Sequence, residues 1–457
     1  MKTPEATHPL FPLTTPPQPS PQARLAGLYP QRQPGLWMQR VRILGGRLTG
    51  PQWIALAHAV RTFTPQTPIH LTTRQDIEFH NVTTQNTLPL QHALANAALT
   101  GQAGGGDGLR NITLCSCPQK HNQDIDLVAL AQTLTARLLE NPLTHSLPRK
   151  FKIALACGQP HCDAQPWIND LSFVLKQNQN TTGFQVIAAG SLGARPATGI
   201  LLYPYRPAAD ILPIALAALA VFNQHGHRKN RARARLRHLR QDLGDQHFAQ
   251  LLDSTLAHTH VEPLEPTPPV KNQHPLQTQH LRLPFPLGQL SPDAADALAR
   301  IADLPGLSIT ITNHHNIVVS SPEHTQLRQI LAAEPKLPQP EQNTPTIVAC
   351  PGTTYCPRAL TNTRNLAKRL NDRLKGRQLP HTTICISGCP NGCAHSTVAP
   401  IGLVGRQTKI EGQLRQCYDL YLNGGLGRNP QLARLAARKL EPDDLLDHLT
   451  KKLLTTE

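Results

Sequence analysis

Two stretches of the chain, GRLTGPQWIALAHAVRTF (Gly46–Phe63) and GQLSPDAADALARIADL (Gly288–Leu304), share one pattern although they lie in opposite halves of the sequence. Each has a hydroxyl residue followed closely by a proline: Thr49 and Pro51 in the first, Ser291 and Pro292 in the second. A hydroxyl side chain caps a helix and a proline fits its first turn, so both stretches predict the start of an amphipathic helix. An internal repeat of this kind constrains the whole fold more than any single motif does.

A β-branched segment follows each predicted helix. These segments are PIHLTTRQDIEFHNV (Pro68–Val82) and LSITITNHHNIVVSS (Leu307–Ser321). The helix start and the strand are 26 residues apart in the first copy and 25 in the second, so the spacing is kept while the side chains differ.

A second pair of matching segments comes later in each half. LRNITLCSCP (Leu109–Pro118) and TPTIVACP (Thr344–Pro351) are apolar strands that end at a cysteine with a proline close behind. A proline-rich connection, His258–Pro275, separates the two halves. The sequence therefore predicts an internally duplicated α+β fold, whose two pseudo-equivalent halves face each other and form one ligand site between them.

Composition limits the class of protein. We notice no run of about 18 apolar residues and no apolar signal core, so we expect a cytoplasmic location and no membrane partner. Ten cysteines in such a compartment are expected to be metal ligands or buried thiols rather than disulfides. The net charge of +16 predicts an acidic partner, which is nucleic acid, an acidic electron carrier or a polycarboxylate cofactor.

The basic charge is concentrated in HGHRKNRARARLRHLRQDLG (His225–Gly244), for which we expect one helix. Its arginines are Arg228, Arg231, Arg233, Arg235, Arg237 and Arg240. A solvated helix face is the simplest interpretation, and docking of an anionic cofactor or partner nearby is the alternative. Nucleic-acid binding is disfavoured because no aromatic residue interleaves these charges.

Four cysteines in the second half form two close pairs. ACPGTTYCPRAL holds Cys350 and Cys356, and ISGCPNGCAHS holds Cys389 and Cys393. The first pair is too widely spaced for a zinc knuckle, whereas four thiolates on glycine-rich loops suit an iron–sulfur cubane. The glycines expected to allow positive-φ turns there, and so to bring amides to the sulfurs, are Gly352, Gly388 and Gly392. Zinc and unligated thiols remain alternatives on spacing alone.

The C-x5-C and C-x3-C pairs, with GCPNGC around the second, resemble the siroheme and [4Fe-4S] reductases of sulfite and nitrite, from about Trp37 to Leu449. The resemblance implies that the four cysteines bind the cubane and that Cys393 also bridges to the siroheme iron. It also implies two ferredoxin-like half-domains plus two larger α/β siroheme-binding halves related by pseudo-two-fold symmetry. The predicted segments are a flexible proline-rich tail (1–30), half-domain 1 (31–104), the first siroheme-binding half (105–257), a linker (258–279), half-domain 2 (280–340), and the siroheme and [4Fe-4S] half (341–457).

An anionic cofactor and an anionic substrate need fixed positive charge. The resemblance assigns this role, in catalysis and in cofactor binding, to Arg74 in LTTRQ, Arg110 in LRNITLC, and Lys150 and Lys152 in LPRKFK. On a strand, the i and i+2 positions put both lysines on one face. We expect the four residues to bind the anion, stabilise charge on the departing oxygens and relay protons.

The implied reaction is the six-electron reduction of sulfite to sulfide, a step of sulfur metabolism. Members that use nitrite tend to have Asn where Lys152 stands, so the lysine favours sulfite, the more highly charged anion. Nitrite reduction to ammonia and a precorrin-3B synthase-like activity are the alternatives. Electrons are expected from an acidic ferredoxin or a separate flavoprotein subunit, since no flavin or nicotinamide domain is visible. A basic zinc protein that binds nucleic acid is the alternative from another class, and it would be colourless.

The remaining candidates are expected to be structural. Cys115 and Cys117 are predicted to be buried near the pocket, with a redox or crosslinking role as the alternative. The cysteines predicted not to be ligands are Cys157, Cys162, Cys385 and Cys417. His70, where family members often have Arg, is interpreted as a packed core residue, with proton donation as the alternative.

Overall fold

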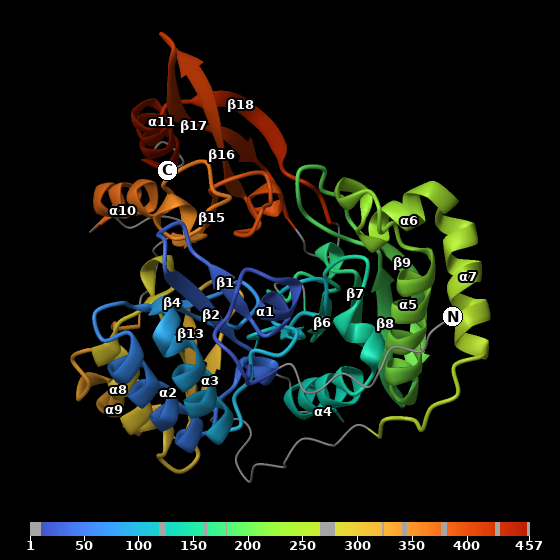
Figure 1. The fold of residues 1–457 in the computed structure, drawn as a ribbon. Helices are drawn as coiled ribbons and strands as arrows, with labels where there is room; N and C mark the ends of the chain where they lie inside the picture. The colour runs from blue at the N-terminus through green and yellow to red at the C-terminus, as the bar shows by residue number, and fades with distance from the viewer. Residues whose placement is uncertain are drawn as a thin grey trace.

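The computed structural model describes residues 11–454, apart from 118–124, 160–161, 180, 266–278, 322–323, 341–344, 376–381 and 426–429. Within these residues the strands form four sheets, two in the half-domains and two in the larger halves. Figure 1 shows the half-domain helices α2 and α8 together at one side, the first larger half (β6 to β9) beside them, and the second (β15 to β18) above.

The two half-domains have the same strand order. It is β2-β4-β3 in the first and β10-β13-β12 in the second, with antiparallel neighbours. The first contains α1 (Pro21–Leu25), β1 (Leu28–Pro30), β2 (Leu36–Val41), α2 (Gly50–Phe63), β3 (Ile69–Leu71), β4 (Ile77–Thr83) and α3 (Thr87–Asn96). The second contains β10 (Gln279–Leu283), β11 (Gln289–Leu290), α8 (Pro292–Ala302), β12 (Ser308–Ile311), β13 (Ile317–Ser321) and α9 (His324–Ala332). The predicted duplication is confirmed.

Local sequence sets both helix starts in the predicted way. Thr49 accepts a hydrogen bond from the Gln52 amide and the Gln52 side chain accepts one from the Thr49 amide, which completes a capping box at α2. Ser291 accepts from the Ala294 amide at the start of α8 (3.1 Å). Each helix has a proline in its first turn.

The half-domains are joined by a reciprocal exchange of backbone pairing. Gln289 in β11 lies opposite His70 in β3, so the second half-domain adds a strand to the first sheet. Arg47, at the matching place before α2, forms an antiparallel bridge with Thr310 in β12. Because the same exchange occurs twice, it fixes the pseudo-two-fold relation between the halves.

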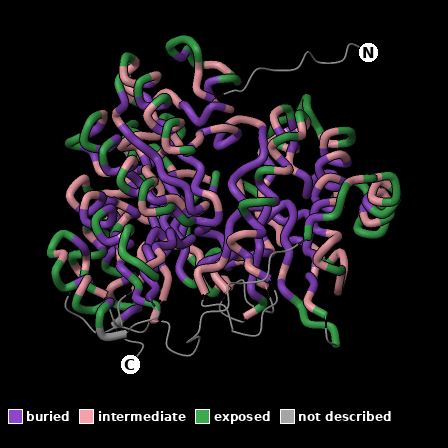
Figure 2. The backbone as a smooth tube through the Cα atoms, turned by 90° about the horizontal axis from the view of Figure 1, so that it is seen from below, coloured by how far each residue is buried: buried purple, intermediate pink, exposed green. Residues whose placement is uncertain are grey.

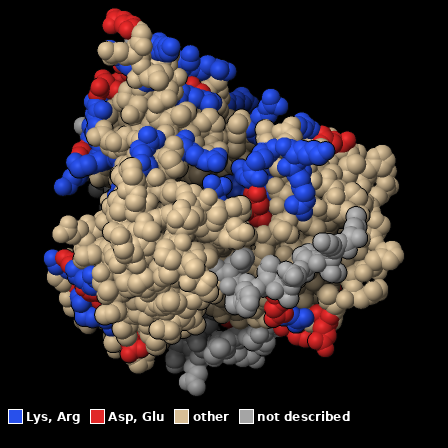
Figure 3. All heavy atoms as spheres, in the orientation of Figure 1, with Lys and Arg blue, Asp and Glu red and all other residues tan. Residues whose placement is uncertain are grey.

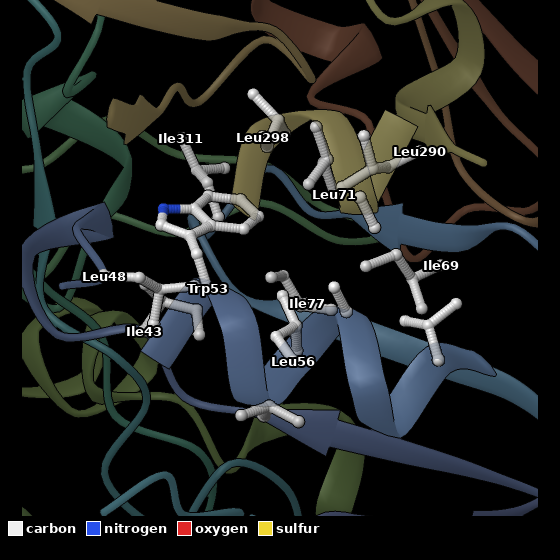
Figure 4. Close-up of a cluster of buried hydrophobic side chains, with 14 of the residues drawn as sticks. Ile43, Leu48, Trp53, Leu56, Ile69, Leu71, Ile77, Leu290, Leu298 and Ile311 are labelled. Atoms are coloured by element: carbon white, nitrogen blue, oxygen red, sulfur yellow. The ribbon is translucent and has the colours of Figure 1, made fainter. Parts of the chain in front are cut away.

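Trp53 of α2 is fully buried in the hydrophobic core that both half-domains share. Figure 4 shows its indole next to Leu298 and Ile311 of the second half-domain, with Ile43 and Leu48 of the first nearby. Within the described part of the chain, its Nε1 has no hydrogen-bond partner. The indole therefore contributes through apolar burial and shape.

Each larger half is built on a mixed five-stranded sheet with one shared order. Three parallel strands come first and two antiparallel strands follow, in the orders β5-β6-β7-β8-β9 and β14-β15-β16-β17-β18. The first sheet has β5 (Thr113–Leu114), β6 (Ile153–Ala156), β7 (Leu171–Asn178), β8 (Thr181–Ala188) and β9 (Ile200–Pro207). The second has β14 (Thr346–Ala349), β15 (Thr383–Ser387), β16 (Ile401–Ile410), β17 (Gln413–Leu422) and β18 (Arg434–Leu440).

Helices of the larger halves follow equivalent strands. α4 (Leu127–Leu139) and α10 (Thr363–Leu374) follow the first strand of each sheet, and α5 (Ile211–His225) and α11 (Pro442–Leu454) follow the last. The first half adds α6 (Leu236–Leu243) and α7 (Asp245–Ala257). Figure 2 shows buried backbone running through the centre of the molecule, with exposed residues mostly on outer helices and loops.

Contrary to the expectation from hydropathy, one helical stretch, Ala208–His225, is long and apolar enough to cross a membrane by length and composition. Half of it is buried inside the fold, and residues of α5 belong to the hydrophobic core of the first larger half. We interpret α5 as a core helix.

Two predictions of local structure differ from what is observed. Within the segment predicted to be a flexible tail, α1 and β1 are ordered, because β1 pairs with β2 and because Ala23 and Leu28 pack in the core. Residues 1–10 of that tail lie outside the described residues.

The basic segment 225–244 is not one helix. α5 ends at His225, a 3₁₀ turn covers Arg231–Arg233, and α6 begins at Leu236. Most of the predicted linker, 266–278, is also outside the described residues.

Replacing Trp53 tests the shared core. Trp53→Ala should lower the free energy of unfolding by about 3–5 kcal/mol, because a large buried side chain leaves a cavity. Trp53→Phe should cost less, since the ring is kept and the unpartnered N–H is removed. Ile54→Ala, at a neighbouring side chain that is half exposed, is the control. It should change the free energy of unfolding by about 0.5 kcal/mol. The shift of the urea unfolding midpoint measures all three, and equal shifts for Trp53→Ala and Ile54→Ala would contradict the shared core.

Candidate functional site

The four cysteines of the second half follow two neighbouring parallel strands. Cys350 comes directly after β14, and Cys389 comes just after β15. The carboxyl ends of parallel strands lie at one edge of a sheet, so the two loops meet there. The side chain of Cys393 is exposed, whereas the other three are partly covered.

Glycines shape these loops in two different ways. Gly352 and Gly392 have φ values of 59° and 66°, as predicted. Gly388 does not have a positive φ; instead its amide donates to the Sγ of Cys350 (3.1 Å). This bond is the expected amide–sulfur contact, and amides directed at thiolates are typical of iron–sulfur sites.

Burial raises the pKa of the thiols on these loops. The pKa of Cys350 is raised to about 12, first by burial and then by the negative charge of Cys393. Burial also raises the pKa of Cys356 and of Cys389, and Cys393 adds to both shifts. A thiolate set with this mutual repulsion needs a positively charged centre to become stable.

Arg74 lies in the turn between β3 and β4 and reaches into the first larger half. Its guanidinium donates to the side-chain oxygen of Asn169 (2.8 Å) and to the carbonyl of Ile153 (3.0 Å), and it also bonds the carbonyl of Asn111. Its Nε is buried and has no hydrogen-bond partner among the residues that the structure describes. Burial lowers the pKa of Arg74 to about 9.

Arg110 is buried and donates to backbone carbonyls of the glycine-rich loop. Its two terminal nitrogens bond Gly105 (2.6 Å) and Gly106 (2.7 Å). Burial lowers the pKa of Arg110 to about 10. The guanidinium therefore holds the loop in shape.

Lys150 and Lys152 flank the buried Phe151 just before β6. Neither lysine belongs to the strand itself, so their placement on one face stays a prediction. Burial, followed by the charge of Arg235, lowers the pKa of Lys150 to about 7. The pKa of Lys152 is lowered well below its usual value by burial and then by Arg74 and Lys150. The negative charge of Cys393, by contrast, raises the pKa of both lysines. The fold thus brings the lysines of one half electrostatically close to a cysteine of the other.

A direct contact joins the same two halves. The hydroxyl of Thr73, next to Arg74, donates to the carbonyl of Cys393 (2.9 Å). The structure therefore places the Arg74 turn, the lysine segment and the Cys393 loop around one region.

The sequence missed two residues of this region, Arg235 and Asp170. Arg235 donates to Asp170 (2.7 Å), whose side chain is fully buried. Asp170 also accepts from the amide of Lys152 (2.8 Å), which ties the lysine segment to the arginine. The basic segment 225–244 was the available signal. Its interpretation as a solvated face is wrong at Arg235 and at Arg237, which is 5% exposed.

His70 is buried beside His315, with ring centroids 5.0 Å apart, and burial lowers its pKa to about 4. It is therefore neutral near pH 7, in agreement with a packed core residue. A small pocket next to Cys350 is lined in part by His70, His80, Tyr355 and Arg364.

The other cysteines do not behave alike. Cys385 and Cys417 are buried singly on β15 and β17. The Sγ atoms of the remaining four, which are Cys115, Cys117, Cys157 and Cys162, all lie within 4.8 Å of one another. The prediction that Cys157 and Cys162 are not ligands does not anticipate this convergence, because the convergence depends on two separate strands ending side by side.

Comparison with known proteins places this arrangement among described families. The family model "Nitrite and sulphite reductase 4Fe-4S domain" matches residues 105–260 and 341–456, and the "Nitrite/Sulfite reductase ferredoxin-like half domain" matches residues 29–97. A ferredoxin–nitrite reductase of Synechococcus elongatus is 31% identical over 92% of this chain and 86% of its own length.

A sulfite reductase [NADPH] hemoprotein beta-component of Acidithiobacillus ferrooxidans is 29% identical over 90% of this chain and 80% of its own. The solved structure of the Mycobacterium tuberculosis NirA protein shares the fold, with a TM-score of 0.78 and 23% identity over 94% of this chain and 85% of that one.

Gly352 offers a test of the cysteine loop. A Cβ there would lie 2.3 Å from the Thr363 hydroxyl oxygen and 2.8 Å from its amide nitrogen. Gly352→Ala should therefore cost about 2–3 kcal/mol of stability and lower the iron and acid-labile sulfide bound per chain. Gly412→Ala is the matched control, because its φ of 79° is equally unfavourable but nothing lies within 4 Å. The prediction fails if both variants bind the same amount of iron as the unchanged protein.

Proposed function

The chain belongs to the nitrite and sulphite reductase family of siroheme- and [4Fe-4S]-dependent oxidoreductases, and we propose that it catalyses the six-electron reduction of sulfite to sulfide. The observation that carries the choice of substrate is the pair Lys150 and Lys152. The bond of Arg74 to the Ile153 carbonyl, and those of Asp170 to the Lys152 amide and to Arg235, hold this segment beside both arginines.

The cysteines of the second half fit the cluster. We assign Cys350, Cys356, Cys389 and Cys393 as its ligands, because they are four thiols on two adjoining glycine-shaped loops with an amide already directed at one sulfur. Cys393, the exposed thiol, would hold siroheme as well as the cluster. When bound, the cluster and siroheme would carry electrons from the external donor, and siroheme would supply the iron to which the anion binds.

The basic residues would hold the anionic groups. Arg74, Arg110, Lys150 and Lys152 are assigned to the siroheme carboxylates and the substrate. The Nε of Arg74 has no hydrogen-bond partner among the described residues, and burial lowers the pKa of both lysines, so a bound anion would favour the charged forms of these groups. Arg110 contributes chiefly by holding the glycine-rich loop, since its terminal nitrogens are occupied by carbonyls.

Proton delivery falls to the lysines. A pKa near 7 lets Lys150 hold a proton at its Nζ and release it near neutral pH. Asp170 and Arg235 keep the segment in place through the bonds of Asp170 to the Lys152 amide and to the guanidinium. The lysines also stabilise negative charge on oxygens that leave the substrate as water.

Nitrite is the second candidate. The relative from Synechococcus elongatus carries nitrite reductase in its name, and it is 31% identical to this chain. Sulfite carries more negative charge near neutral pH, however, so the second lysine supports sulfite on electrostatic grounds. Replacing Lys152 should therefore change the ratio of kcat/KM for sulfite to kcat/KM for nitrite.

An acidic ferredoxin is the proposed electron donor, with a separate flavoprotein subunit as the alternative. Figure 3 shows Lys and Arg side chains gathered over the part of the molecule that carries β16 to β18. Exposed members on β17 and β18 are Arg415, Arg434, Arg438 and Lys439. Complementary charge would guide an acidic carrier to the half that holds the cluster. The cytoplasmic location stays a prediction.

Lys152→Asn tests the choice of substrate. The full holoenzyme is assayed with a reduced viologen, and sulfide or ammonia is measured. Loss of a charge-assisted contact worth about 1.5–3 kcal/mol should lower kcat/KM for sulfite about 10–100-fold and change nitrite turnover much less. Lys176→Asn, at an exposed lysine on β7, is the control. If kcat/KM falls equally for both anions, or does not fall for either, the role given to Lys152 is wrong.

The pKa of Lys150 predicts the pH dependence of anion binding. The protonated lysine attracts the anion, and a bound anion raises the lysine pKa, so binding takes up a proton. The KM for nitrite, an anion whose charge does not change in this range, should therefore rise as pH increases above about 7. Lys150→Arg keeps its charge and should flatten this rise. A KM that is constant from pH 6 to 9 in the unchanged protein would contradict the assignment.

A further inference from the structure

The first larger half contains a second set of four thiols, away from the proposed cluster ligands. The Sγ atoms of Cys115, Cys117, Cys157 and Cys162 all lie within 4.8 Å of one another, and they are the only such group of metal-ligand side chains among the described residues. No disulfide joins them. We propose that these four cysteines bind one thiophilic divalent metal ion, zinc or ferrous iron, in a tetrahedral tetrathiolate site.

The distances favour one metal ion over a cluster. Four sulfurs at about 2.3 Å from a single zinc are roughly 3.8 Å apart. The observed limit of 4.8 Å is close to that spacing. A cubane needs its ligand sulfurs farther apart because four irons lie between them, and the cysteines of the second half do not form so tight a group in the described residues.

The internal duplication explains why the thiols meet here. Cys115 follows β5 and Cys157 follows β6, just as the second-half cysteines follow β14 and β15. Cys162 takes the place that Cys393 takes in the second half. Each is followed by a residue of positive φ (Gln165, 51°; His395, 62°), by a 3₁₀ turn, and then by the third parallel strand of its sheet.

Two sets of contacts hold the cysteine loops before any metal binds. Ser116, between the first two cysteines, donates through its amide (2.7 Å) and its hydroxyl (2.6 Å) to Asp163, the neighbour of Cys162. The Leu114 amide donates to Gln75 (2.7 Å), and its carbonyl accepts from Asn313 (2.7 Å). Both half-domains thus fix the end of β5, and the Ser116–Asp163 pair ties one loop to the other.

The Cys115-x-Cys117 spacing is shorter than that of a zinc knuckle. This short spacing is compatible with one metal ion because the other two ligands, Cys157 and Cys162, come from the neighbouring loop. The side chain of Ser116 between the two cysteines bonds Asp163 and is therefore turned to that residue rather than toward the sulfurs. Four soft thiolates in a tetrahedral set select zinc or iron over the harder divalent cations.

The site would act on catalysis by positioning. The chain runs from Cys162 directly to Asn169 and Asp170, which hold Arg74 and Arg235. A metal ion at the start of that segment would keep the anion-binding side chains in place without touching the substrate.

The test measures the metals in the purified full-length holoenzyme by mass spectrometry. The protein as produced should contain one zinc per chain, or one iron beyond those of siroheme and the cluster. The double variant Cys117→Ser with Cys162→Ser should lose this ion at least tenfold while keeping its siroheme and acid-labile sulfide. Cys417→Ala, at a buried thiol on β17, is the control and should keep the ion.

X-ray absorption at the edge of that metal identifies its ligands without a variant, which matters if the double variant does not fold. Four sulfurs at about 2.3 Å from zinc, or the equivalent shell around iron, support the proposal. It is overturned by the absence of an extra ion, by four extra irons with matching sulfide, or by two disulfides in the mass of the alkylated chain. None of these readouts depends on enzyme activity, so they remain informative even if the proposed substrate is wrong.

Discussion

The reciprocal pairing of β11 with β3 and of Arg47 with Thr310 is the constraint on which the rest of the structure depends. Each half-domain supplies backbone hydrogen bonds to the other, and Trp53 fills the core between them. Because the turns after β3 and β12 are fixed by this exchange, each reaches a cysteine loop: Thr73 reaches Cys393, and Asn313 reaches the residue before Cys115. The geometry of both thiol sets follows from one pseudo-two-fold arrangement.

Positive charge is held in the site by burial and by neighbouring backbone. The lysines have lowered pKa values because water is excluded and because Arg74 and Arg235 lie nearby. Separating such charges would stabilise the isolated protein, yet Asp170, Asn169 and backbone carbonyls keep them together. A site that is electrostatically unfavourable when empty is suited to a carboxylate-rich cofactor and an anionic substrate, since these restore the balance of charge.

Prediction from sequence succeeded where the signal is local or repeated. The capped helices, the strands behind them and the duplicated α+β fold are confirmed, because propensity and hydrophobic pattern act within each short segment. It was wrong for the basic segment 225–244, where charge density suggested a solvated helix but Arg235 turns inward to a buried carboxylate. It also failed to connect Cys115 with Cys157, because residues on separate strands carry no mark of their spatial proximity.

The sequence by itself determined the capped starts of the half-domain helices and several of the residues that could perform chemistry. Cysteine spacing, glycines beside the thiols, and two lysines at i and i+2 are local properties that folding does not alter. Only the tertiary structure decided which of these groups meet. The parallel neighbours β5 and β6 end side by side, so two pairs of thiols that are far apart in sequence, Cys115 with Cys117 and Cys157 with Cys162, converge to within 4.8 Å. Burial then shifted the lysine pKa values, because exclusion of water is a property of the packed halves and not of any segment alone.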